Sequence, residues 1–170
     1  MDPNAMRVTE ELTSFLPFDK GQRVLNLRCD TGLSSLLLAE KYGVTVYAYH
    51  YFGCNGFMLP TLMTFVKKGG QIAVAVSGLK DDFPNGVFPG ELQPFRQPGM
   101  NFYSPAWWQA LWEQTENFRV DTCREMDCML TAWAGWLQCP NPYAQSDIPM
   151  IHAEGGKHFY LVQITGTVIT

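Results

Sequence analysis

The chain alternates short runs of strand-forming residues with segments whose apolar residues recur at helical spacing. Residues 22–27 (QRVLNL) form a β-rich run, and residues 31–42 carry apolar side chains at helical spacing. Residues 44–52 are β-branched and aromatic, and residues 71–76 (QIAVAV) form a continuous apolar run. This alternation is typical of parallel sheets with helices on their faces. We therefore expect an α/β, Rossmann-like fold with a mainly parallel sheet of about five strands and flanking helices.

The second half of the chain begins with an irregular segment. Residues 77–103 are interrupted by prolines and glycines and are too long for a tight connection, so we predict a long loop or lid over one end of the sheet. Ser104 and Pro105 then supply an N-cap and a first-turn proline. The remaining pattern predicts a helix at 106–114, a strand at 118–126, a helix at 129–138 and a strand at 157–169.

Length and composition favour one domain. The 170 residues are 46% hydrophobic and 16% charged, enough for one ordinary core. We expect a single domain over residues 1–170, with residues 1–20 as an N-terminal arm.

Charge and hydropathy exclude several partners. The net charge is −4, and no basic run is longer than Lys67-Lys68, so we expect no nucleic-acid partner. No apolar stretch approaches the roughly 20 residues that span a bilayer, and residues 1–5 do not resemble a signal peptide. We expect a cytoplasmic protein without a membrane partner. The five cysteines form no C-x-x-C pair, which favours reduced, space-filling thiols.

Residues 21–32 (GQRVLNLRCDTG) resemble the first motif of the class I S-adenosylmethionine-dependent methyltransferases. In that family a strand ends in acidic-x-Gly-x-Gly-x-Gly before a helix. The resemblance continues through the Lys-Lys-Gly-Gly turn before the apolar strand at 71–76. Residues 103–113 and 125–142 look like the tail of bacterial small-molecule methyltransferases related to cyclopropane-fatty-acid synthases. The resemblance covers nearly the whole chain and implies S-adenosylmethionine as the cofactor.

The motif is degenerate at the positions that would touch this cofactor. Asn26 replaces the acidic residue, and Arg28 and Asp30 replace the two early glycines, so that only Gly32 remains. Glycine at such positions lets the backbone approach a cofactor closely, and a side chain fills that space. We expect S-adenosylmethionine to bind weakly or not at all.

The chain is also shorter than the family that it resembles. The acidic residue expected after the second strand is absent, because Tyr49-His50-Tyr51 follows Ala48. Residues 44–52 look like the start of a second strand joined to the end of a fourth strand, without the intervening strand–helix–strand unit. The resemblance places His50 and Tyr51 on the side of the methyl acceptor. We weigh contact of these two residues with a ligand against burial in a strand.

Two other groups of residues have alternative interpretations. His152, Glu154 and His158 could ligate a metal, but Gly155-Gly156 does not hold them on one face, which favours structural histidines and no metal site. The five tryptophans could line a pocket for an aromatic or lipid-like ligand, although filling of the core is the stronger interpretation.

Loss of covering elements would expose an apolar sheet edge at residues 22–27, and such edges tend to pair with another chain. We therefore expect a homodimer. The motif damage indicates a methyltransferase-like protein that has lost methyl transfer and persists as a binding or interaction module, with a small molecule as its ligand. The alternative is an active S-adenosylmethionine-dependent small-molecule methyltransferase whose pocket is completed by the dimer partner. The residues themselves leave the substrate and any catalytic residue open.

Overall fold

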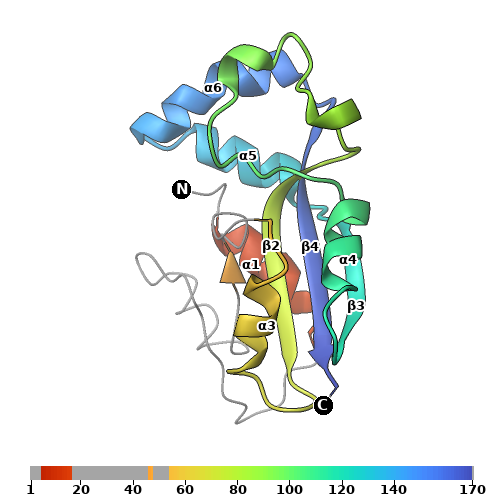
Figure 1. Ribbon diagram of the computed structural model, residues 1–170. Helices are drawn as coiled ribbons and strands as arrows, with labels where there is room; N and C mark the ends of the chain where they lie inside the picture. Colours follow the sequence, from red (N-terminus) through yellow and green to blue (C-terminus); the bar gives the residue numbers. More distant parts are fainter. Residues whose placement is uncertain (1–4, 17–45, 48–53, 170) are drawn as a thin grey trace.

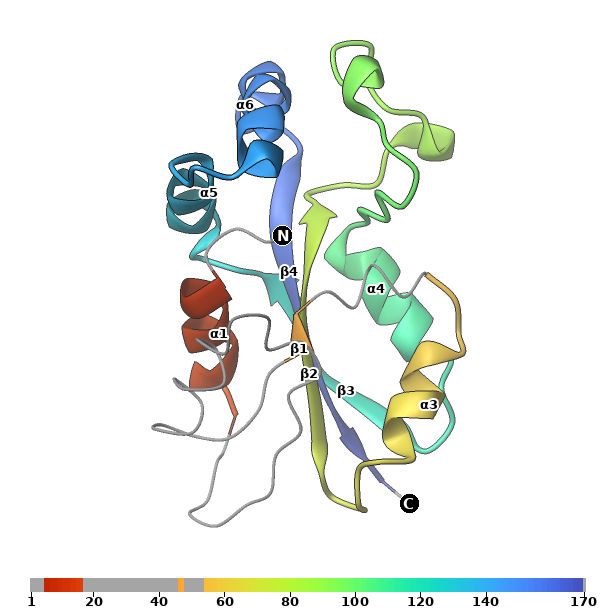
Figure 2. The same ribbon diagram turned by 90° about the vertical axis from the view of Figure 1, so that its left-hand side faces the viewer.

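The computed structural model describes residues 5–16, 46–47 and 54–169. A twisted sheet lies between two layers of helices (Figures 1 and 2). In chain order, the described elements are α1 (Ala5–Ser14), β1 (Val46–Tyr47), α3 (Met58–Met63), β2 (Gln71–Leu79), α4 (Pro105–Trp112), β3 (Phe118–Glu125), α5 (Met129–Leu137), α6 (Pro142–Glu154) and β4 (Phe159–Val168), with short 3-10 turns at Pro84–Gly86 and Gln93–Phe95.

The described strands form one sheet in the order β1-β2-β4-β3. β1 is parallel to β2, whereas β4 is antiparallel to both β2 and β3. The α/β class is confirmed, but the expectation of a mainly parallel sheet is wrong for these four strands. The physical reason is that hydrophobic periodicity is the same for both strand directions, and the last strand enters between two earlier ones. The strand and helix expected at 22–42, and the rest of 44–52, lie outside the described residues.

The face of the sheet toward α3 and α4 carries an apolar core. Ile72, Val74 and Val76 of β2 alternate with residues of the opposite face and are buried, as expected for a central strand. Trp108 and Trp112 of α4 pack on this face and are fully buried. Figure 2 shows α3 and α4 together on this side of the sheet.

The opposite face is covered by α1 and α5 (Figure 2). Val8 and Leu12 of α1 are fully buried and belong to the same core cluster as Ala73 and Ala75 of β2. Spacing of four residues places Val8 and Leu12 on one stripe of the helix, which explains how a short helix docks on the sheet.

Local sequence signals account for the ends of α4 and α6. Ser104 caps α4 by accepting a hydrogen bond from the Trp107 N–H, as predicted. Asn141 caps α6 in the same way through the Tyr143 N–H, and Gly155 ends α6 with a φ of 61°. The helix α6 was not predicted, although Asn141 and Pro142 mark its beginning and Gly155 marks its end. No helix within the described ranges has the length and apolarity to cross a bilayer.

The buried carboxylate of Glu154 shapes the entry into β4. Its oxygens accept hydrogen bonds from the backbone N–H groups of Gly156, His158 and Phe159. Glu154 is 2% exposed, so these donors replace the water that the carboxylate has lost. Glu154, at the end of α6, therefore holds the turn that leads through residues 155–158 into β4.

A second carboxylate, Glu11, ties α1 to the rest of the fold. Its oxygens accept hydrogen bonds from the backbone N–H groups of Asp127 (2.7 Å) and Cys128 (2.6 Å), at the start of α5, and from Arg124 Nη2 at 2.9 Å. Burial raises the pKa of Glu11, but these hydrogen bonds and the Arg124 charge outweigh burial, so the pKa lies below its ordinary value of 4.5.

We expect Glu11→Gln to lower the free energy of unfolding by roughly 1–3 kcal/mol at neutral pH, because charge-assisted hydrogen bonds are lost. A lowered folded-state pKa contributes stability above the unfolded-state pKa and loses it as pH falls through the folded-state value. The difference from wild type should therefore shrink below about pH 4.5. Urea unfolding at several pH values measures this. Glu10→Gln, at an exposed position of the same helix, is the control, and equal losses in both variants would contradict the tie.

Candidate ligand-binding site

The site residues proposed from the sequence lie outside the described part of the chain. These are the degenerate motif positions Asn26, Arg28, Asp30 and Gly32 and the acceptor-side residues His50 and Tyr51. The structure therefore leaves their arrangement open, and the site that can be built lies elsewhere.

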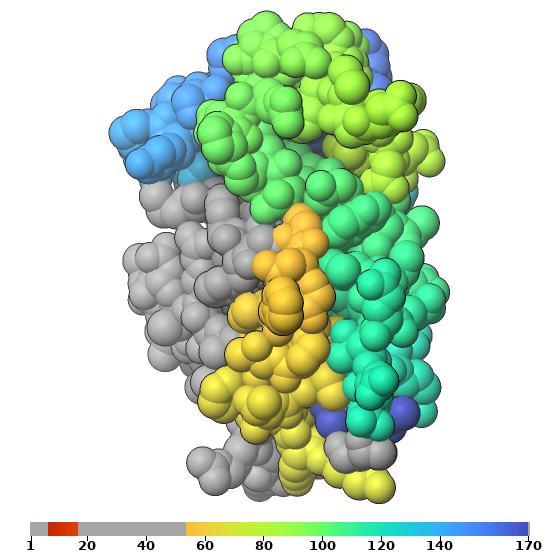
Figure 3. Space-filling model, viewed as in Figure 1, coloured from red at the N-terminus to blue at the C-terminus, as the bar shows by residue number. Residues whose placement is uncertain are grey.

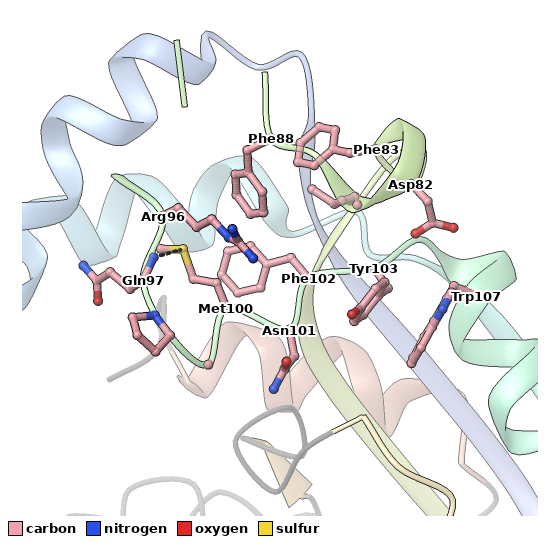
Figure 4. Close-up of a pocket in the computed structure, with 14 residues that line it drawn as sticks. Asp82, Phe83, Phe88, Arg96, Gln97, Met100, Asn101, Phe102, Tyr103 and Trp107 are labelled. Carbon is pink, nitrogen blue, oxygen red and sulfur yellow. Dashed lines mark hydrogen bonds between the residues drawn. The ribbon is translucent and has the colours of Figure 1, made fainter. Parts of the chain in front are cut away.

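A pocket of about 660 Å³ opens beyond the carboxyl end of β2 (Figure 4). Leu79 is the last residue of β2, and Trp107 comes from the first turn of α4. Every other lining residue belongs to residues 82–103, the segment that the sequence predicted to be a long loop or lid. In open α/β sheets, ligands bind beyond the carboxyl ends of the parallel strands, so this is where a binding site is expected.

The two ends of this loop are fastened together, so the pocket has a fixed base. The Leu79 N–H donates to the Tyr103 carbonyl at 3.1 Å. Asp82 Oδ1 accepts from the Ser104 N–H, and Asp82 Oδ2 accepts from the Ser104 hydroxyl, both at 2.7 Å. The same hydroxyl accepts from the Trp107 N–H at 3.2 Å. One serine thus caps α4 and joins both ends of the loop.

Aromatic rings form much of the pocket wall. The Tyr103 and Trp107 rings are stacked, with centroids 3.9 Å apart and planes 14° apart. Phe83 and Phe88 lie 5.0 Å apart, and Phe102 meets Phe159 of β4 edge to face. Flat, half-buried rings offer contact area at little cost in conformational entropy. Of the five tryptophans, only Trp107 lines the pocket, and the other four are buried in the cores. Filling of the core therefore describes four of them, and a place in a pocket wall describes one.

Two charged side chains line the pocket, Asp82 and Arg96. Both oxygens of Asp82 are hydrogen-bonded to Ser104. Burial raises the pKa of Tyr103, and the nearby Cys54 and Asp82 raise it further, so the phenol stays neutral at pH 7 and is available to a ligand as a hydrogen-bond donor. The two groups differ in their contacts, because Asp82 is hydrogen-bonded to Ser104, whereas the guanidinium of Arg96 has no ion pair among the described residues.

Three of the described cysteines are poor nucleophiles. Burial raises the pKa of Cys54 to about 11 and the pKa values of Cys123 and Cys128 to about 12. Their thiolates are therefore scarce at neutral pH. Within residues 5–16, 46–47 and 54–169, no three His, Cys, Asp or Glu side chains come together as a metal site. The chemistry that this pocket offers is binding by stacking, apolar contact and one guanidinium.

Sequence reasoning missed these pocket residues. It predicted the loop from its prolines and glycines, but local patterns do not tell which loop side chains converge. The available signal was positional, because the loop follows a continuous apolar strand, and the carboxyl end of such a strand is a common place for a ligand.

We expect Asp82→Ala to loosen the loop, because the variant removes both bonds to Ser104. Backbone amide exchange over residues 83–103 should accelerate by roughly 3- to 10-fold, measured by hydrogen exchange with mass spectrometry. Asp81→Ala is the matched control, since it removes the same charge from the neighbouring exposed position. Equal exchange in the two variants would show that the Asp82–Ser104 bonds do not hold the loop.

Comparison with known proteins bears on the fold. No family profile and no curated protein sequence matches this chain. Solved methyltransferase structures do match its fold. Geranyl diphosphate C-methyltransferase from Streptomyces coelicolor A3(2), solved with S-adenosyl-L-homocysteine, is 11% identical, with a TM-score of 0.69 over 96% of this chain and 78% of its own. Phospholethanolamine N-methyltransferase 2 from Haemonchus contortus is 8% identical, with a TM-score of 0.70 over 99% of this chain and 54% of its own.

YjhP from E. coli gives a TM-score of 0.63 at 12% identity, over 99% of this chain and 94% of its own. At sequence identities this low, the comparison shows that the helices and strands are arranged in the same way, and it does not show shared chemistry. The resemblance inferred from the sequence is confirmed at that level. The chain has the fold of the class I S-adenosylmethionine-dependent methyltransferases.

Proposed function

We propose that this chain is a methyltransferase-like protein that has lost methyl transfer and binds a small molecule in the pocket at the end of β2. One observation carries the proposal. The described residues that line the pocket all belong to residues 79–107, whereas the degenerate motif positions lie at residues 26–32. Binding in the pocket therefore does not require the glycines that the motif has lost.

The loss of transfer rests on steric grounds. Arg28 and Asp30 place side chains where the resembling motif has glycines, and the acidic ribose ligand has no counterpart after Ala48. S-adenosylmethionine is the relevant cofactor for this fold, since structural neighbours were solved with it or with S-adenosylhomocysteine. The alternative, an active enzyme whose pocket is completed by a second copy, differs from the proposal in one measurable property, the affinity for that cofactor.

Calorimetric titration with S-adenosylhomocysteine tests the loss of transfer. We expect a dissociation constant in the millimolar range or weaker, because Arg28 and Asp30 stand where the resembling motif has glycines that leave room for the cofactor. The matched variant Arg28→Gly/Asp30→Gly should bind more tightly than wild type. A low-micromolar constant for the wild-type chain would contradict the proposal and favour the active enzyme.

The protein also acts, in this proposal, as a homodimer. The sequence predicts an apolar sheet edge at residues 22–27. In addition, two aromatic side chains next to α3 are exposed, Phe57 (81%) and Phe65 (70%). Figure 3 shows α3 at the molecular surface beside α4. Apolar side chains gathered on a surface are typical of protein contacts.

Light scattering coupled to gel filtration measures the oligomeric state. At micromolar concentration we expect a species of twice the mass of one chain, because burial of apolar surface outweighs the cost of association. A single-chain mass that persists as the protein is concentrated would contradict the dimer and leave the binding proposal unaffected.

A further inference from the structure

Arg96 gives the pocket an electrostatic preference. It is exposed at the wall of a cavity whose other described lining residues are aromatic and aliphatic, with two amides, Gln97 and Asn101, and one carboxylate, Asp82. Figure 4 shows its side chain extending among Phe88, Met100 and Phe102 rather than away from the pocket. Its guanidinium carbon lies 5.9 Å from the Phe88 ring centroid, at the outer limit of a cation–π contact, so the Phe88 ring compensates its charge only weakly.

The other charged group of the wall does not neutralise Arg96. Both oxygens of Asp82 are hydrogen-bonded to Ser104. In Figure 4, Asp82 lies near Tyr103 and Trp107, whereas Arg96 lies beside Phe88, Met100 and Phe102. Glu91 forms its described ion pair with Lys157, at 3.9 Å. A ligand in the pocket therefore meets the positive charge of Arg96 at one part of the wall and the hydrogen-bonded Asp82 carboxylate at another.

We propose that the pocket binds a molecule with a flat apolar body and one anionic group, with the anion on Arg96 and the ring against the aromatic wall. The proposal rests on the proposed function, since it names the ligand class of the same pocket. A guanidinium presents a planar fork of N–H donors that matches either a carboxylate or a phosphate, so anionic oxygen is the shared chemistry. The stacked Tyr103 and Trp107 rings, 3.9 Å apart, supply a flat surface of matching shape.

Three probes that share one ring system separate the contributions. They are naphthalene-2-carboxylate, 2-naphthyl phosphate and the neutral methyl ester of the carboxylate, titrated into the full chain by calorimetry. We expect both anions to bind roughly 10- to 100-fold more tightly than the ester, because a charge-assisted hydrogen bond is gained only with the anions. The ratio of the two anions tells whether the site prefers carboxylate or phosphate.

Two variants of Arg96 test whether its charge is responsible for the preference for anions. Arg96→Gln should bring the anions to the affinity of the ester and leave the ester unchanged, whereas Arg96→Lys should keep part of the preference. Lys68→Gln is the matched control, because it removes an exposed positive charge from the turn before β2, at the opposite end of that strand. Circular dichroism of each variant confirms that it is folded.

The outcomes distinguish this inference from the function on which it rests. Equal binding of ester and anions, or an anion preference that survives Arg96→Gln, overturns the assignment of the anion to Arg96 and leaves the pocket as a binding site. Failure of all three probes to bind overturns both proposals. Low-micromolar binding of S-adenosylhomocysteine together with the expected anion preference overturns only the loss of methyl transfer.

Discussion

The structure depends on the position of β4 between β2 and β3. Its ladder with β2 runs from the pair Gln71 and Thr167 to the pair Leu79 and Phe159, and it pairs with β3 on its other side. Both faces of β2 and of most of β4 are buried, so the backbone groups of these strands satisfy their hydrogen bonds within the sheet rather than with water. The Glu154 carboxylate fixes the turn through which the chain enters β4. Because β2 is held this way along its length, its carboxyl end is a rigid base for the loop that follows.

The pocket is formed by the loop that follows β2 and depends on the hydrogen bonds that hold the two ends of this loop together. A loop of this length costs conformational entropy to order, and the described structure offsets this cost by anchoring rather than by regular structure. Asp82 and Ser104 close the base, and Phe102 packs against Phe159 of β4. The same serine begins α4, which carries Trp107 into the pocket wall. Residues that order the loop are therefore also the residues that position its aromatic surface.

Sequence patterns predicted elements where the signal is local. The cap at Ser104, the strand after the Lys-Lys-Gly-Gly turn and the last strand all agree with the structure within a few residues. Strand direction was not predictable, because the alternation of apolar side chains is identical in parallel and antiparallel pairs. The helix α6 was missed because Pro149 interrupts its pattern and its apolar residues form no single stripe. The convergence of Arg96 with Phe88 is a tertiary result that no local pattern encodes.

Within the described part of the chain, the residues that form the pocket and the cores differ from the degenerate motif positions. The described cores on the two faces of the sheet are built from α1, α3, α4, α5, α6, the loop residue Leu92 and the strands themselves. In the proposed function, the ligand therefore meets side chains of residues 79–107, whereas the glycines that the resembling motif has lost would serve the cofactor. A chain selected for binding alone would have no physical reason to keep those glycines, but it would need Asp82, Ser104 and the buried ladder that holds β2.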